Sequence, residues 1–292
     1  MSTTSLQRAI RRHPGRYVRA ALFYGVLAAF LTSILLPLYY IFLTTFAPGD
    51  QVFTTPLTYL PRSLGIERYR TIFDAIPIGR YLLNTLLIST VGAVLSLLVS
   101  FLAAYSIARL RFPGADLVLI GLLVSSMLPG VTSFVPLFKM YQRFDLLNTV
   151  QGLLLLYVSA LLPLTTWILV SFIKQVPIEV EEAARVDGAG FLSLIWQIVL
   201  PMILPALATL FLINFIVNWN EFFIPLVFAR GEGTKVITMA LFEAQALGGG
   251  SQYYQNWGNL SAVAILATIP IFAITLLFQR QITAGIMAGA VK

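Results

Sequence analysis

The sequence predicts an all-α membrane protein with six transmembrane helices, and three observations lead to this prediction. Hydrophobic residues make up 58% of the 292 residues and charged residues only 11%, a composition far more apolar than that of soluble globular domains. Six stretches reach the length of about 20 mainly apolar residues that a helix needs to cross the hydrocarbon layer. An arginine-rich segment precedes the first stretch, as is common on the cytoplasmic side of membrane proteins.

The six predicted spans differ from the segments between them in having almost no charged side chains. We place the spans at residues 22–46, 82–107, 117–137, 152–173, 204–228 and 260–278. The chain then divides into a basic N-terminal tail (1–21), one six-span domain (22–279) and a C-terminal tail (280–292). An even number of spans places both termini on the same side of the inner membrane. Five arginines in the first tail identify this side as the cytoplasm: Arg8, Arg11, Arg12, Arg16 and Arg19.

The segments that connect the spans differ in character. Residues 47–80 form a polar outer loop with several prolines. Residues 230–259 form a second outer segment, whose Tyr and Trp side chains suit either the membrane interface or contact with a partner protein outside the membrane. Residues 109–114 (RLRFPG) form a tight inner turn, in which Pro-Gly ends the preceding helix and Arg109 is expected to reach lipid headgroups.

A polar stretch on the inner side, residues 177–201, reads PIEVEEAARVDGAGFLSLIWQIVLP. Pro177 suits the first turn of a helix, and the carboxylates that follow complement the positive end of the helix dipole. Gly188 can take the left-handed conformation that closes a helix, so a helix of about 11 residues is expected. The small side chains of Ala183 and Ala184 at its centre favour close docking on another protein. The alternative is an amphipathic cytoplasmic helix that docks on nothing.

This stretch resembles the EAA motif of the permease subunits of ABC importers. The matching residues are E-A-A at 182–184, Gly188, and I-x-L-P at 198–201. The resemblance implies that the loop is a cytoplasmic coupling element, which sits in a cleft of a separate ATPase subunit. The expected ATPase-coupling residues are Glu182, Ala183, Ala184, Asp187 and Gly188.

Further matches, spread over most of the chain, resemble the MalG-like permeases of maltose-type sugar importers. They include Asn84-Thr85-Leu86, residues 103–112, Leu147-Asn148-Thr149 and Trp219-Asn220-Glu221-Phe222. The resemblance implies a pathway for a carbohydrate or related polyol, formed together with a homologous permease subunit. It also implies a dimeric cytoplasmic ATPase that carries ATP and Mg²⁺, and an extracytoplasmic solute-binding protein.

Three polar residues in the fifth predicted span, Asn214, Asn218 and Glu221, are spaced i, i+4 and i+7. They would share one face of a helix, and a central acid facing lipid would cost about 2.5–3.5 kcal/mol on insertion scales. The face must therefore contact protein or water. It is either a set of hydrogen bonds between helices or the polar lining of the solute pathway, and both interpretations stay open.

The chain has no cysteine and one histidine, His13, which lies in the basic tail. These residues offer no metal site. The sequence contains no G-x-x-x-x-G-K-[ST] phosphate-binding loop and no G-x-S-x-G or H-E-x-x-H motif. We therefore expect a translocation subunit and not an enzyme, with no cofactor of its own. The net charge of +7 is explained by topology and neighbouring anionic lipid, and we expect no nucleic-acid partner.

The alternative function is a self-sufficient secondary transporter or channel that uses Glu221 as a proton or cation site. Such a carrier is expected to contain inverted repeats with broken helices at the midplane, and it has no need of a docking loop on the cytoplasmic side. A membrane enzyme ranks third, because the sequence lacks a catalytic set.

Overall fold

The computed structural model describes residues 14–47, 60, 63–110, 112–128, 130–247 and 257–290, with side chains from residue 18 to residue 279. In these ranges all regular structure is helical. The helices are α2 (Pro14–Phe46), α3 (Glu67–Ala75), α4 (Ile78–Arg109), α5 (Ala115–Met127), η2 (Gly130–Ser133), α6 (Phe134–Arg143), α7 (Val150–Gln175), α8 (Ile178–Val186), α9 (Phe191–Ser193), η3 (Leu194–Val199), α10 (Leu200–Asn220), α11 (Phe223–Phe228), α12 (Ile237–Ala246) and α13 (Trp257–Ala290).

Five helical segments of the described chain are long and apolar enough to cross a membrane. They are Val18–Phe46, Ile78–Arg109, Val150–Gln175, Phe191–Asn220 and Trp257–Gln279. The pair formed by α5 and the η2–α6 segment would supply a sixth crossing if it is counted as one span. The prediction of an all-α membrane protein is confirmed, and the predicted number of spans agrees with the upper count.

The third predicted span, 117–137, is not one straight helix. Its two parts, Ala115–Met127 and Gly130–Arg143, meet at an angle of 92°. Leu128, which follows the first part, has extended backbone angles (φ −73°, ψ 136°), and in the sequence it precedes a proline, which disfavours helical geometry in the residue before it. A continuous apolar run therefore concealed a bend.

The fifth predicted span, 204–228, is also shorter than expected at its end. The helix stops at Asn220, and Glu221 has extended backbone angles (φ −66°, ψ 128°). Pro225 lacks the N–H that would bond to the carbonyl of Glu221 if the helix continued. The Thr238 hydroxyl donates to that carbonyl instead, at 2.8 Å, and the short helix α11 follows.

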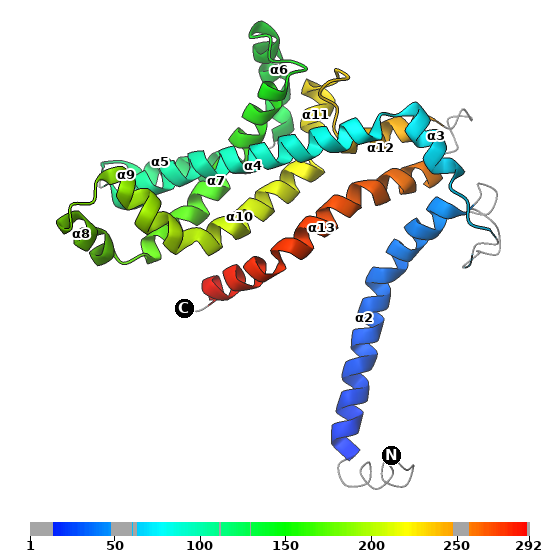
Figure 1. Cartoon of the computed structure of the whole chain (residues 1–292), viewed down its shortest axis with the longest axis horizontal. Helices are drawn as coiled ribbons and strands as arrows, with labels where there is room; N and C mark the ends of the chain where they lie inside the picture. The colour runs from blue at the N-terminus through cyan, green and yellow to red at the C-terminus, as the bar shows by residue number, and fades with distance from the viewer. Residues whose placement is uncertain are drawn as a thin grey trace.

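The helices α4, α7 and α10 pack against one another at the centre of the bundle, and α13 lies along α10 and α12. Figure 1 shows α8 and α9 at one end of the bundle, hereafter the α8 end, and α3 and α12 at the other, the α12 end. The helix α2 projects away from the bundle (Figure 1). Only 6% of the apolar part of α2 is buried within the chain, compared with 50% for α7.

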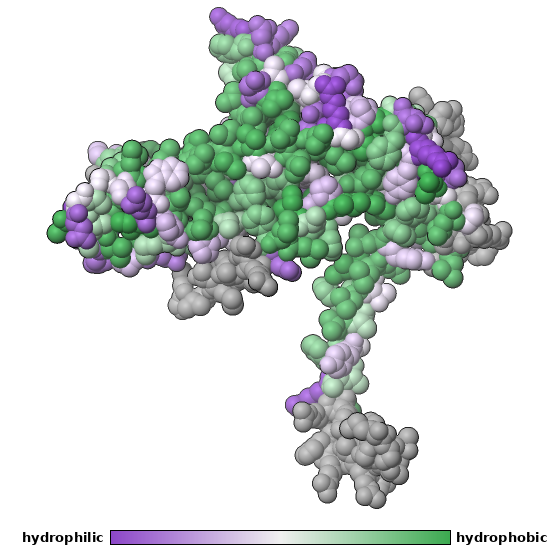
Figure 2. Space-filling model, in the orientation of Figure 1, coloured by the Kyte–Doolittle hydropathy of each residue, from purple (hydrophilic) through white to green (hydrophobic). Residues whose placement is uncertain are grey.

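Hydrophobic side chains cover the long sides of the bundle and α2, whereas hydrophilic side chains gather at the α8 end and near α6 and α12 (Figure 2). This distribution is that of a protein whose sides face lipid or another membrane chain.

The helices α2 and α13 continue past the expected domain boundaries, since α2 begins at Pro14 and α13 extends to Ala290. Several residues considered above lie outside the described ranges: Arg8, Arg11, Arg12, His13 and the aromatic segment 248–256.

Candidate functional site

The predicted docking helix is present as α8, which spans nine residues. Pro177 is its N-cap and Asp187 its C-cap, so the helix is slightly shorter than expected and begins after the proline. Gly188 has φ +88°, the left-handed conformation that favours glycine. The N–H groups of Gly188 and Ala189 donate to carbonyls in the last turn, at 3.1 Å and 2.9 Å. The prediction that Gly188 closes this helix is confirmed.

Most of the expected coupling residues are exposed on or next to α8. Glu182, Ala183, Asp187 and Gly188 are exposed, and Ala184 is half-buried. Val186, also on this helix, is 87% exposed, so the exposed surface of α8 includes a large apolar side chain. This exposed surface, small at Ala183 and apolar at Val186, is called the docking face below.

The opposite side of α8 carries a buried ion pair that the sequence did not reveal. Glu181 is 1% exposed, and its Oε1 accepts a hydrogen bond from Arg109 Nε at 2.6 Å. Its Oε2 accepts one from the Tyr105 hydroxyl at 3.0 Å. The arginines of this turn were expected to be able to reach lipid headgroups, but Arg109 bonds to Glu181 instead, and Arg111 lies outside the described residues. The partner of Arg109 lies 72 residues later in the chain, and no local pattern distinguishes Glu181 from the exposed acids beside it.

The chain after α8 enters the membrane helix through a widened turn. η3 is a π-helix, in which the Leu200 N–H donates to the Ile195 carbonyl, five residues earlier. Pro201 follows directly and has no N–H to donate to the carbonyl of Gln197. A π-turn before it redistributes the hydrogen bonds over a wider ring, as is common near functional sites. The I-x-L-P part of the motif therefore spans the end of η3 and the first two residues of α10.

Two of the three predicted pathway residues lie inside the bundle. Asn214 and Asn218 are 2% and 3% exposed. The Thr165 hydroxyl of α7 donates to Asn214 Oδ1 at 3.2 Å, and Asn218 Nδ2 donates to the Ser89 carbonyl of α4 at 3.5 Å. A Cβ added to Gly92 of α4 would lie 3.0 Å from Asn218 Nδ2. The two asparagines thus join α10 to α7 and α4, and Asn218 lies where α10 comes close to Gly92 of α4.

This interior also holds polar atoms without a partner. Four buried side-chain atoms have no hydrogen-bond partner in the described structure: Ser89 Oγ, Ser96 Oγ, Thr166 Oγ1 and Asn214 Nδ2. They come from α4, α7 and α10, the same three helices that Asn214 and Asn218 join. This group of polar side chains, with Thr165, Asn214 and Asn218, is called the polar seam.

Glu221 does not share a helical face with the asparagines, because the helix ends before it. Its Oε1 accepts a hydrogen bond from the Ile224 N–H at 3.1 Å, and this contact caps the first turn of α11. Trp219 points elsewhere: its indole N–H donates to the Ala267 carbonyl of α13 at 3.1 Å. The spacing i, i+4, i+7 predicted that the three polar residues share one helical face. In the structure Asn214 and Asn218 are buried in the bundle, whereas the Glu221 carboxylate accepts a hydrogen bond from the first turn of α11.

At the α12 end, polar contacts hold the segment before α12 against α4. Asn84 Nδ2 donates to the carbonyls of Gly233 and Lys235, at 3.0 Å and 2.9 Å. The Lys235 ammonium pairs with Glu232 and Glu243. The hydrogen bond from Lys235 to Glu232 is the largest cause that raises the pKa of Lys235 above its usual value, and the hydrogen bond to Glu243 is the next. Specific side-chain contacts thus attach the segment before α12 to α4 at this end of the bundle.

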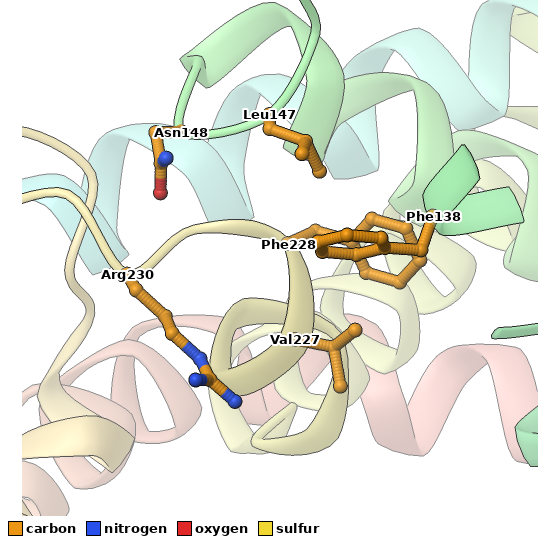
Figure 3. A pocket seen from close by; sticks show the side chains of 6 residues that line it. All are labelled: Phe138, Leu147, Asn148, Val227, Phe228 and Arg230. Atoms are coloured by element: carbon orange, nitrogen blue, oxygen red, sulfur yellow. The ribbon is translucent and has the colours of Figure 1, made fainter. Parts of the chain in front are cut away.

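A pocket of about 210 Å³ opens between α6 and α11. Figure 3 shows Phe138 and Phe228 close together on one side and Asn148 and Arg230 on the other. Asn148 has φ 58°, and its Oδ1 accepts from the Gly231 N–H at 2.8 Å while its own N–H donates to the Phe228 carbonyl at 2.8 Å. Asn148 therefore joins the turn before α7 to the end of α11.

Comparison with known proteins identifies the family. Residues 96–287 match the family described as the binding-protein-dependent transport system inner membrane component. The chain is 31% identical to the diacetylchitobiose uptake system permease protein NgcG of Streptomyces coelicolor, over 94% of this chain and 89% of the relative. It is 32% identical to the trehalose transport system permease protein SugB of Mycobacterium tuberculosis, over 94% and 98% of the two chains.

A further relative is the trehalose/maltose transport system permease protein MalG of Thermococcus litoralis, 32% identical over 91% of this chain and 95% of the relative. Among solved structures, the fold matches a chain of a bacterial ABC transporter that imports the acidic polysaccharide alginate. The TM-score is 0.77 at 22% identity, over 90% of this chain and 96% of that chain. The family match covers more than half of the chain and includes α8, η3 and α10. The protein therefore belongs to the binding-protein-dependent transport system inner membrane components, the permease subunits of ABC importers.

Proposed function

We propose that this permease imports a carbohydrate and couples to a separate ATPase through α8. The observation that supports the coupling is the docking face, because the small exposed Ala183 leaves room for the close approach of a partner and the 87% exposed Val186 offers it an apolar contact. Carbohydrate is supported by the relatives, whose names specify diacetylchitobiose, trehalose or maltose. ATP and Mg²⁺ would bind to the partner ATPase.

Three partner proteins complete the proposed importer. A homologous permease would cover the apolar surface of α2, which the chain itself leaves almost bare. A dimeric ATPase would bind at the α8 end. A solute-binding protein would bind at the α12 end, and one solved relative of this fold is an alginate transporter in complex with its sugar-bound periplasmic protein.

Reconstitution of the complete importer in proteoliposomes tests this function. We expect ATP-dependent uptake of a disaccharide or a short oligosaccharide, and ATP hydrolysis that rises when the sugar-loaded binding protein is added. Trehalose, maltose and diacetylchitobiose are the first substrates to compare. Uptake that continues without ATP and follows a proton gradient would contradict the proposal and favour the secondary transporter.

The proposed orientation places the α8 end, and both termini, in the cytoplasm. The chain has no cysteine, so single cysteines can be labelled selectively. In intact cells that express the permease without its partner ATPase, a membrane-impermeant maleimide should label Glu232→Cys, whose side chain is 70% exposed at the α12 end, and should label Val186→Cys only after permeabilisation. Labelling of Val186→Cys in intact cells would reverse the topology.

For the polar residues of α10, the buried geometry favours packing over a pathway. We infer that Asn214 and Asn218 hold α10 against α4 and α7, because both are almost fully buried and bond to these helices. Glu221, which is only partly buried, would position α11. Hydrogen bonds between membrane helices contribute about 0.6 kcal/mol each, so the bonds of Asn214 and Asn218 would each add a small amount of stability.

A further inference from the structure

Glu181 is a buried carboxylate on a helix whose other acids are exposed. Its side chain is 1% exposed, while that of its partner Arg109 is 9% exposed. Both carboxylate oxygens are used, Oε1 by Arg109 and Oε2 by Tyr105. A charge is buried in this way only when it is paired and hydrogen-bonded, since an unpaired buried charge is strongly unfavourable. The contact is therefore a specific attachment of α8 to α4.

Arg109 extends this attachment to a third helix. Its Nη2 donates to the Val176 carbonyl at 2.7 Å, and Val176 is the C-cap of α7. Tyr105 also contacts the segment that follows α8 in the chain. Its ring lies edge-on to the ring of Phe191 in α9, with the two ring centroids 5.9 Å apart. One cluster of side chains, defined by Tyr105, Arg109 and Glu181 and called the joint below, thus connects α4, α7, α8 and α9.

The covalent connections of α8 alone would leave it free to pivot. On one side the chain passes through Val176-Pro177, and on the other through a turn that includes Gly188, which is left-handed, and Gly190, which is extended. By contrast, α4 and α7 are packed along their lengths in the bundle core. The joint therefore fixes a nine-residue helix to two helices that belong to the hydrophobic core at this end.

The joint and the docking face lie on opposite sides of α8. Residues 181 and 183 are separated by roughly 200° around a helix with about 100° per residue. Glu181 is buried and Ala183 is exposed, in agreement with this geometry. A change at Glu181 can therefore loosen α8 from the bundle without altering the surface offered to a partner.

We propose that Tyr105, Arg109 and Glu181 are positioning residues that transmit the movement of α8 to α4 and α7 during transport. This inference rests on the proposed docking of α8 on an ATPase. With the joint intact, a displacement of the docking face moves the ends of two core helices. With the joint broken, α8 follows the ATPase while the core helices stay behind, so ATP is hydrolysed without transport.

The test uses the complete importer in proteoliposomes and compares Glu181→Ala with Glu179→Ala, an exposed acid of the same helix. We expect Glu181→Ala to co-purify with the ATPase and to retain basal ATP hydrolysis, with the ratio of sugar imported to ATP hydrolysed reduced at least tenfold. Glu179→Ala should keep the ratio of the unmodified importer. An unchanged ratio in Glu181→Ala would overturn the proposal, as would loss of the ATPase from this variant.

A second variant separates coupling from folding. Tyr105→Cys with Glu181→Cys removes the joint and allows a short bifunctional maleimide to bridge α4 and α8, in a complex whose partner subunits also lack cysteine. Transport per ATP should be low before bridging and should rise severalfold after it. No rise in a bridged, assembled complex would overturn the proposal. If the unmodified permease itself fails to bind an ATPase, the docking function is wrong, and this outcome is distinct from uncoupling.

Discussion

Ala183→Arg is expected to abolish ATP-dependent uptake while the permease still accumulates normally in the membrane. Ala183 is exposed at the centre of α8, and an exposed helix position accepts arginine at a cost well below 1 kcal/mol. The helix itself should therefore form. A large charged side chain would instead hold the ATPase surface away from the docking face. Co-purification of the ATPase with the tagged variant measures the effect, and we expect at least a tenfold loss.

Ala183→Ser is the matched control, because it keeps a small side chain at the same position. It should retain most of the association and uptake of the unmodified protein. Full association and full uptake in Ala183→Arg would show that α8 is not the coupling element. The joint proposal would then lose its premise, whereas failure of the joint variants alone would leave the docking face in place.

Gly92→Leu is expected to prevent stable packing of the bundle. At this position of α4, even a Cβ atom would lie 3.0 Å from Asn218 Nδ2 and 3.6 Å from the Tyr157 Cβ. A leucine must displace α10 or α7, and overpacking of this kind costs typically about 1–3 kcal/mol and occasionally more. We expect a sharp fall in the amount of folded permease recovered in detergent, measured by fluorescence-detected size-exclusion chromatography.

Gly79→Leu, in the same helix, is the control, since no atom lies within 4 Å of a Cβ added there. It should be recovered like the unmodified protein. Asn218→Leu then distinguishes packing from a solute pathway. If Asn218 packs the helices, this variant loses thermal stability and keeps its KM for the sugar. A KM raised at least tenfold at normal stability would restore the pathway interpretation for this residue.

The sequence predicted the docking helix well because its signals are local. Pro177, the acids after it and Gly188 each act on the backbone within one or two turns, and the structure places the helix between Pro177 and Gly188. The apolar spans were predicted for a similar reason, since length and composition alone decide whether a helix can cross the hydrocarbon layer.

The failures occurred where distant parts of the chain decide the outcome. Glu221 was placed on a helix because its spacing fitted, but Pro225 and a hydroxyl from Thr238 end that helix first. Arg109 was assigned to lipid because its partner Glu181 lies far along the sequence. An i, i+4, i+7 pattern describes a face only if the helix continues, and a single sequence does not show which distant charge will complete a pair.

The π-turn at η3 has a consequence for how the length of this segment is constrained. A π-turn holds about one residue more than an α-turn, and each residue rotates a helix by roughly 100°. Because the extra residue is taken up within one wider turn, the segments before and after η3 keep nearly the phase of an uninterrupted α-helix with one residue fewer. Deleting one residue from Leu194–Val199 is therefore expected to restore regular α-geometry and to leave Phe191 beside the ring of Tyr105. A deletion in the regular part of α10 would instead rotate everything before it by roughly 100°, and the turn that carries α8 would point in another direction. The six residues of η3 are thus the part of this segment that best tolerates a change in length.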